Sequence, residues 1–136
     1  MVFDQARHRA AGEEILARTV VLAAQMTYLQ FQRTPGLEEA LGATGTAKSH
    51  RDAEYNLQFL SEAISSGDPA GFASYLVWLD GVLAGVGLDR SVLDDHLDCM
   101  IETLSNSLEP EVRDLAVEYV REGIAGLAAG RAEVAP

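Results

Sequence analysis

An arginine and an aspartate stand side by side at residues 51 and 52, followed by an aromatic and an amide at Tyr55 and Asn56. Neighbouring helix positions point about 100° apart, so Arg51 and Asp52 do not pair with each other. They can instead hold two parts of one ligand, because an arginine fork binds carboxylates and an aspartate accepts N–H hydrogen bonds. The pattern predicts a site for a flat, anionic, nitrogen-rich ligand. The alternative is a solvated first helical turn, where an acidic residue suits the helix dipole.

A row of aromatic residues follows on the next predicted helix. Phe72, Tyr75 and Trp78 recur at every third position, so they share one side of that helix. Such a row can wall a pocket, and it can equally be ordinary core packing. Buried Trp and Tyr need partners for their polar atoms, so Trp78 can face a ligand or a protein partner.

An acidic row, Asp94, Asp98 and Glu102, stacks at intervals of four residues. Carboxylates can bind a hard cation such as calcium. The same spacing is typical of a solvated acidic face, and we predict no metal site. His8, His50 and His96 are too scattered for zinc.

Motifs of enzymatic chemistry are absent from the sequence. It has no paired Glu-x-x-His, no glycine-rich phosphate loop and no nucleophile elbow. We therefore predict a protein that is not an enzyme, with no catalytic residues.

Charge and composition narrow the possible partners. The 136 residues carry a net charge of −11. Residues 1–52 are neutral overall, so the whole excess lies in residues 53–136. An acidic chain repels phosphate backbones and anionic membranes, and neither is expected as a partner. The single cysteine, Cys99, the lack of a signal-peptide core and the lack of a roughly 20-residue apolar run predict a cytoplasmic location.

Helical periodicity runs through the chain, and we predict an all-α fold of about six helices in one domain, residues 1–128, with a frayed tail at 129–136. Asp4, Asp68 and Asp89 are expected to cap helices. Two periodic rows are expected to be buried: Ala53, Leu57, Leu60 and Ile64, and Leu93, Leu97, Met100, Leu104 and Leu108. The first helical region is expected to break near Gly12, and residues 42–46 to form a loop after a short turn at 37–41. Two architectures fit: a globin-like fold, and a four-helix bundle with an N-terminal extension.

The string from Lys48 to Phe59 resembles the chromophore helix of the phycobiliproteins, whose pattern is Cys-x-Arg-Asp-x-x-Tyr-Tyr-Leu-Arg. Gly67-Asp68 closes the helix at a comparable distance, and the run Ser91 to Asp95 is similar to a later stretch of that family. The compact globins associated with bilin biosynthesis look closest. The rhythm of Phe72, Tyr75 and Trp78 is also similar to helical sensor modules of bacterial regulators that carry cobalamin-binding domains.

The resemblance implies a globin-like fold that holds a linear tetrapyrrole (bilin). Arg51 would then meet a propionate and Asp52 the pyrrole N–H groups. Ser49 stands where the family has its thioether cysteine, so a bilin would be held noncovalently. The expected site is Ser49, Arg51, Asp52, Tyr55, Tyr75 and Trp78. Heme in the usual globin arrangement is not expected, because residues 69–86 contain no histidine.

The expected function is therefore binding or carrying of a bilin. The alternative is a regulatory, sensor or dimerisation module that has no ligand, and a homodimer fits that alternative.

Overall fold

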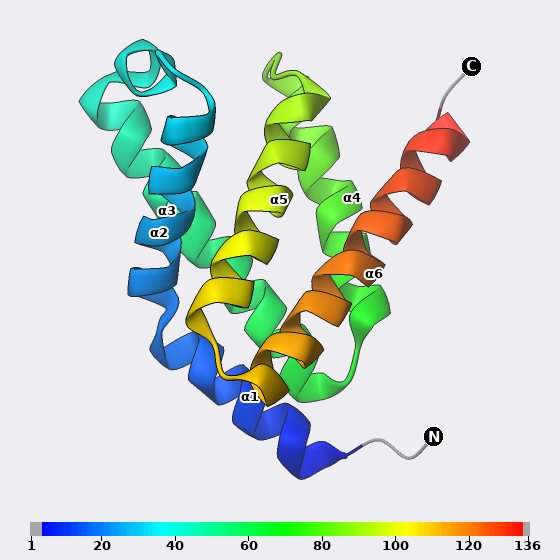
Figure 1. Cartoon of the computed structure of the whole chain (residues 1–136). Helices are drawn as coiled ribbons and strands as arrows, with labels where there is room; N and C mark the ends of the chain where they lie inside the picture. Colours follow the sequence, from blue (N-terminus) through cyan, green and yellow to red (C-terminus); the bar gives the residue numbers. More distant parts are fainter. Residues whose placement is uncertain (1–3, 135–136) are drawn as a thin grey trace.

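Six helices build the protein in the computed structural model, which describes residues 4–134 (Figure 1). They are α1 (Gln5–Ala17), α2 (Thr19–Arg33), α3 (Leu37–Ser66), α4 (Pro69–Gly85), α5 (Arg90–Ser107) and α6 (Pro110–Val134). The prediction of an all-α fold with about six helices is confirmed. In Figure 1, α2, α5 and α6 lie in front, α3 and α4 behind them, and α1 crosses the base.

Three aspartates begin helices as predicted. The Asp4 carboxylate accepts a hydrogen bond from the Arg7 backbone N–H at 3.0 Å. Asp68 accepts from Gly71 and Asp89 from Ser91, each at 2.9 Å. Each carboxylate satisfies a backbone donor that a helix start would otherwise leave free.

The first helical region breaks at Arg18, so the prediction of a break near Gly12 is wrong. The Thr19 hydroxyl donates to the carbonyls of Ile15 and Leu16, which satisfies groups at the end of α1. Gly12 lies within α1, at the point where α3 crosses it. At this crossing the Ser61 hydroxyl donates to the Gly12 carbonyl at 2.7 Å. Glycine here serves close helix packing.

The predicted loop at residues 42–46 is also wrong. The backbone kinks at Gly42, with φ 69° and ψ −178°, and residues 43–46 continue as helix. Glycine adopts this left-handed φ without the steric cost that a Cβ brings. The segment Leu37–Leu41 therefore projects at an angle from the rest of α3, at the upper left of Figure 1.

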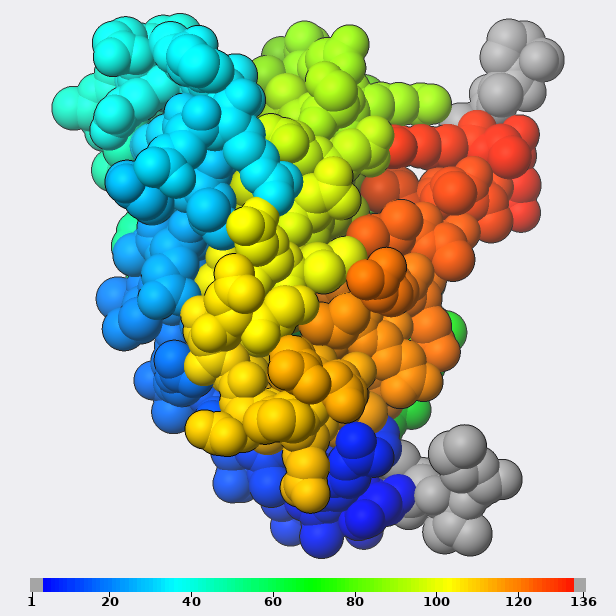
Figure 2. All heavy atoms as spheres, in the orientation of Figure 1, coloured from blue at the N-terminus to red at the C-terminus, as the bar shows by residue number. Residues whose placement is uncertain are grey.

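One hydrophobic core joins all six helices. The predicted rows Ala53, Leu57, Leu60, Ile64 and Leu93, Leu97, Met100, Leu104 are buried as expected. Glycines bring α4 and α6 together: a Cβ added at Gly126 would lie 2.6 Å from that of Ala73. The face seen in Figure 2 is formed mainly by side chains of α2, α5 and α6, with α1 along the base.

Helix α6 extends through the segment expected to fray, as far as Val134. Arg131, near its end, donates to the carboxylates of Asp80 on α4 and Asp94 on α5, each at 2.8 Å. These bonds tie the last turns of α6 to two other helices. Residues 1–3 of the predicted domain and 135–136 of the predicted tail lie outside the described residues.

Candidate functional site

A cleft of about 170 Å³ lies between α2, α3, α4 and α5. Two of the predicted site residues, Ser49 and Asp52, line it. The remaining lining is mostly apolar and comes from all four helices and the α4–α5 connection: Gln30, Phe31, Leu37, Leu41, Asn56, Leu79, Leu83, Leu88, Val92, Leu93 and His96. Such a mixture of many apolar and few polar groups is typical of small-molecule sites.

The direction in which each side chain points from the axis of α3 decides which predicted residues reach this cleft. Ala53 and Leu57 are buried, which directs Asp52 and Asn56 to the cleft side of the helix. Arg51 is exposed and does not contribute to the lining. Arg51 and Asp52 therefore do not face one enclosed space together.

The aromatic members of the predicted site also separate. Tyr55 is 51% exposed and Trp78 is 61% exposed, and neither lines the cleft. Tyr75 is partly buried, and its ring stacks on Phe59 with centroids 3.9 Å apart. Tyr75 is therefore less exposed than Tyr55 and Trp78, although it is not part of the cleft lining.

A polar chain runs from Tyr75 to the cleft. The Tyr75 hydroxyl donates to the Asn56 amide oxygen, and the Asn56 amide nitrogen lies 2.9 Å from His96 Nε2. With the amide oriented by Tyr75, Asn56 donates to His96 Nε2, so the neutral imidazole carries its proton on Nδ1. Asn56 belongs to the sequence pattern that predicts a site here, but neither Asn56 nor His96 is in the set of ligand-binding residues expected from the resemblance. For Asn56 the available signal was its spacing, four residues after Asp52 and beside the buried row of α3.

Burial shifts the pKa values of His96 and Tyr75, the two ends of this hydrogen-bonded series. Burial lowers the pKa of His96 to about 4, and the nearby Asp95 carboxylate opposes that shift only in part. Burial, with a further contribution from the Asp52 charge, raises the pKa of Tyr75 to about 12. At neutral pH the phenol is therefore a donor and the imidazole is uncharged, so Asp52 is the only ionised member of the group Ser49, Asp52, Asn56, Tyr75 and His96.

Asp52 has neither an ion pair nor a hydrogen bond within residues 4–134. Its carboxylate is free to accept hydrogen bonds from a ligand at the edge of an apolar space. A hydrogen bond to a charged group contributes about 1.5 to 3 kcal/mol. Asp52 is exposed at this edge and is the one acidic side chain of the cleft lining, so it can form the strongest hydrogen bonds there.

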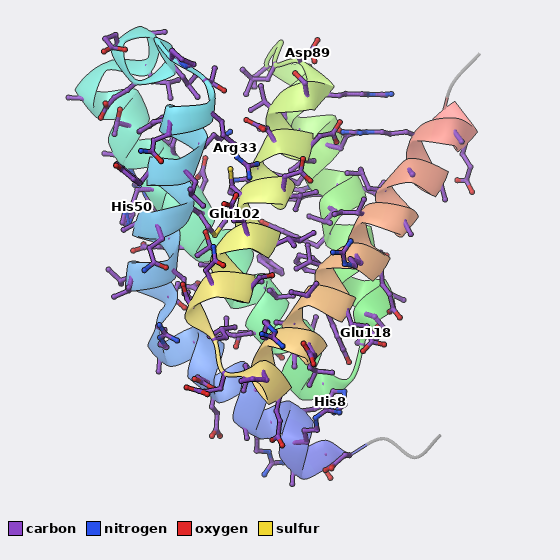
Figure 3. The ribbon with its side chains drawn as sticks, in the orientation of Figure 1. His8, Arg33, His50, Asp89, Glu102 and Glu118 are labelled. Atoms are coloured by element: carbon purple, nitrogen blue, oxygen red, sulfur yellow. The ribbon has the colours of Figure 1, made fainter. Side chains whose placement is uncertain are left out.

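Ion pairs hold the helices that frame the cleft. Arg33 on α2 pairs with Glu102 on α5, and Asp95 lies 3.9 Å from the same guanidinium (Figure 3). Within the acidic row, Asp94 and Glu102 are thus both engaged by arginines. Among the described residues, no cluster of three or more His, Cys, Asp or Glu side chains is arranged to hold a metal ion.

Cys99 is fully buried, and burial raises the pKa of its thiol to about 11. Because the thiolate is the reactive form, the raised pKa keeps this cysteine in the less reactive thiol form at neutral pH. It offers no attachment point for a pigment.

The low pKa of His96 predicts an acid-sensitive fold. An unfolded histidine titrates near 6.5, so between pH 6.5 and 4 the unfolded chain binds more protons and stability falls as the pH is lowered. The loss should be on the order of 2 kcal/mol, less than a fully enclosed ring gives, because His96 borders the cleft.

The measurement is urea unfolding at pH 7 and pH 4.5 for the wild type and His96→Gln. Subtracting the change in unfolding free energy of His96→Gln from that of the wild type removes the contribution of the carboxylates, because both proteins share them. His50→Gln, at an α3 position outside the cleft lining, is the control for replacing a histidine by glutamine. An unchanged pH dependence in His96→Gln would contradict the prediction.

Comparison with models of known protein families gave no match, and neither did a comparison with curated proteins. No helix in residues 4–134 combines the length and apolar character needed to cross a bilayer. The functional conclusion therefore depends on the cleft and on the resemblance carried by residues 48–59.

Proposed function

We propose that the protein binds a linear tetrapyrrole noncovalently and has no catalytic activity. The observation that supports this most is the free Asp52 carboxylate at an apolar cleft that ends in the Asn56–His96 pair. Pyrrole rings are flat and apolar, and their N–H groups are the donors that such a carboxylate accepts. Ser49 cannot form a thioether and Cys99 is enclosed in the core, so the association is noncovalent.

The size of the cleft limits how the pigment enters. Sites for drug-sized ligands measure about 300–1,000 Å³, and this cleft has about 170 Å³. One end of the pigment enters, and the rest lies across the outer surface of α3. Arg51, which points away from the cleft on the adjacent position, is then placed to pair with a propionate outside it.

Titration with biliverdin tests the proposal. Binding should shift the visible absorption of the pigment, and Asp52→Asn should weaken the affinity about 10- to 100-fold through loss of charge-assisted hydrogen bonds. Asp98→Asn is the matched control, because Asp98 is exposed on α5 and absent from the cleft. Ser49→Ala should have little effect.

A second variant tests the cleft independently of the carboxylate. Val92→Phe fills part of the space while leaving Asp52 in place, and it should also reduce affinity. Heme and cobalamin belong in the same thermal-shift experiment. If biliverdin changes neither absorption nor melting, or if Asp52→Asn and Asp98→Asn bind equally well, the proposal is wrong.

We place this function in the bacterial cytoplasm, where a buried reduced thiol such as that of Cys99 is ordinary. The alternative is the regulatory or sensor module without a ligand. A protein that ignores all three pigments and still self-associates would favour that alternative.

A further inference from the structure

Two side chains of the cleft have fixed and opposite hydrogen-bonding roles. Asp52 is exposed at the edge, and its carboxylate can only accept hydrogen bonds. His96 lies in the lining with its Nε2 bonded to the Asn56 amide, so its second ring nitrogen is an Nδ1–H group that can only donate. Gln30 and Ser49, which also line the cleft, can both donate and accept, so they do not discriminate between ligands.

The Nδ1–H group of His96 has no partner within residues 4–134. It is also not among the polar atoms that the fold encloses without a partner, so it is accessible, and the space that His96 lines is the cleft. In His8, by contrast, Nδ1 lies 2.8 Å from the Asp4 carbonyl of its own helix. No hydrogen bond joins His96 to Asp52 in the described part of the chain. Both groups are therefore available to the same ligand.

The size of the cleft limits the enclosed part of that ligand to one ring. A cavity of about 150 Å³ holds a benzene molecule, and this cleft has about 170 Å³. Leu79, Leu83 and Val92 supply apolar walls for the faces of such a ring. A ring that satisfies both polar groups needs an N–H for Asp52 and a carbonyl oxygen for His96. A ring with only one of them leaves a polar group of the cleft unpaired, which weakens binding.

We propose that the cleft recognises a cyclic amide (lactam), in which an N–H and a C=O stand side by side on one ring. Asp52 accepts from the N–H, and His96 Nδ1–H donates to the C=O. This inference rests on the proposed function and names the end of the pigment that enters. In a linear tetrapyrrole such as biliverdin only the terminal rings are lactams, whereas the propionates are on the inner rings. A terminal ring enters, and the propionates stay outside, where Arg51 is exposed.

Single-ring probes test this recognition in the wild-type protein by NMR titration. 2-Pyrrolidinone has both groups, cyclopentanone lacks the N–H, and pyrrole lacks the carbonyl. 2-Pyrrolidinone should bind and shift the ring signals of His96. Cyclopentanone should bind about 10- to 100-fold more weakly, because the bond to the charged carboxylate is lost, and pyrrole about 3- to 10-fold more weakly. Equal affinities for the three probes, or unchanged His96 signals with 2-pyrrolidinone, would overturn the proposal.

The position of the His96 proton gives a second test. Long-range ¹H–¹⁵N spectra at neutral pH should show Nδ1 protonated and Nε2 unprotonated. The reverse tautomer would present an acceptor to the ligand and would refute the proposal.

His96→Leu removes the donor. The preference for 2-pyrrolidinone over pyrrole should then disappear, while retained binding of pyrrole shows that the cleft is intact. His50→Leu, outside the cleft lining, is the matched control and should keep the preference. A preference that persists in His96→Leu would assign the carbonyl contact to another group and contradict the proposal.

Biliverdin, titrated beside the probes, separates this proposal from the proposed function. His96→Leu should weaken biliverdin binding about 3- to 10-fold. If biliverdin binds the wild type and His96→Leu equally well, lactam recognition is refuted and the proposed function stands. If 2-pyrrolidinone is preferred but biliverdin does not bind, the pigment is refuted and the cleft remains a site for a smaller cyclic amide.

Discussion

Replacing Gly12 by alanine is expected to lower the free energy of unfolding by about 2–3 kcal/mol. A Cβ at this position would lie 2.0 Å from the Ser65 hydroxyl oxygen and 2.8 Å from the Ser61 carbonyl oxygen. The Ser65 side chain can rotate away, but the Ser61 oxygen belongs to the backbone of α3. Helices α1 and α3 must therefore move apart, which also strains the hydrogen bond from the Ser61 hydroxyl to the Gly12 carbonyl.

Gly81→Ala is the matched control for Gly12→Ala. Both glycines lie within helices and neither has a positive φ. At Gly81 the new methyl group meets open space, so only the better helix propensity of alanine counts, and stability should rise by up to about 1 kcal/mol. Chemical denaturation of the two variants should give shifts of opposite sign. Equal shifts would show that the α1–α3 contact is looser than described.

Local sequence signals predicted the helices well where neighbouring residues decide the conformation. The aspartate caps and the buried leucine rows depend on spacing within one helix, and both are confirmed. The predicted break near Gly12 and the predicted loop at 42–46 are wrong because a glycine does not always end a helix. At Gly12 it permits a close crossing, and at Gly42 it kinks a helix that continues.

The candidate site was predictable in part for a similar reason. The buried row of α3 already implies that Asp52 and Asn56 share a side, and Asp52 does line the cleft. The contribution of α5 required knowledge of which helices meet, so His96 could not be assigned from spacing alone. Trp78 lies on the same helix as Tyr75 but faces outward, and only the contact of α4 with its neighbours decides that difference.

A single carboxylate in an otherwise apolar helix also predicts a charged partner elsewhere in the chain, because a buried charge must be paired. Asp80 is that carboxylate, and its partner Arg131 lies 51 residues further along the chain. All three guanidinium nitrogens are used: Nε and Nη2 donate to Asp80, and Nη1 donates to Asp94. The side chains of Asp80 and Arg131 are 12% and 19% exposed. This clamp explains why α6 stays helical to Val134.

Arg131→Met is expected to cost about 3 kcal/mol of stability, since it keeps the apolar stem and leaves the Asp80 charge without its main partner. Arg90, 3.9 Å from Asp80, compensates only in part. Arg121→Met is the control, because Arg121 is exposed on the same helix and has no ion pair within residues 4–134. The double variant Asp80→Leu with Arg131→Met should recover much of the loss, because it removes the stranded charge as well.

Acid titration gives the same contact a second test. Hydrogen bonds from Arg131 hold the pKa of Asp80 below its ordinary value of 3.8. A carboxyl whose pKa is depressed on folding stabilises the fold above the unfolded pKa and loses that contribution as the pH falls through the folded pKa. Wild-type stability should therefore drop below about pH 4, and Arg131→Met should show a smaller drop over that range. A variant that unfolds with the same acid dependence as the wild type would mean that the Arg131–Asp80 pair does not hold α6 to α4.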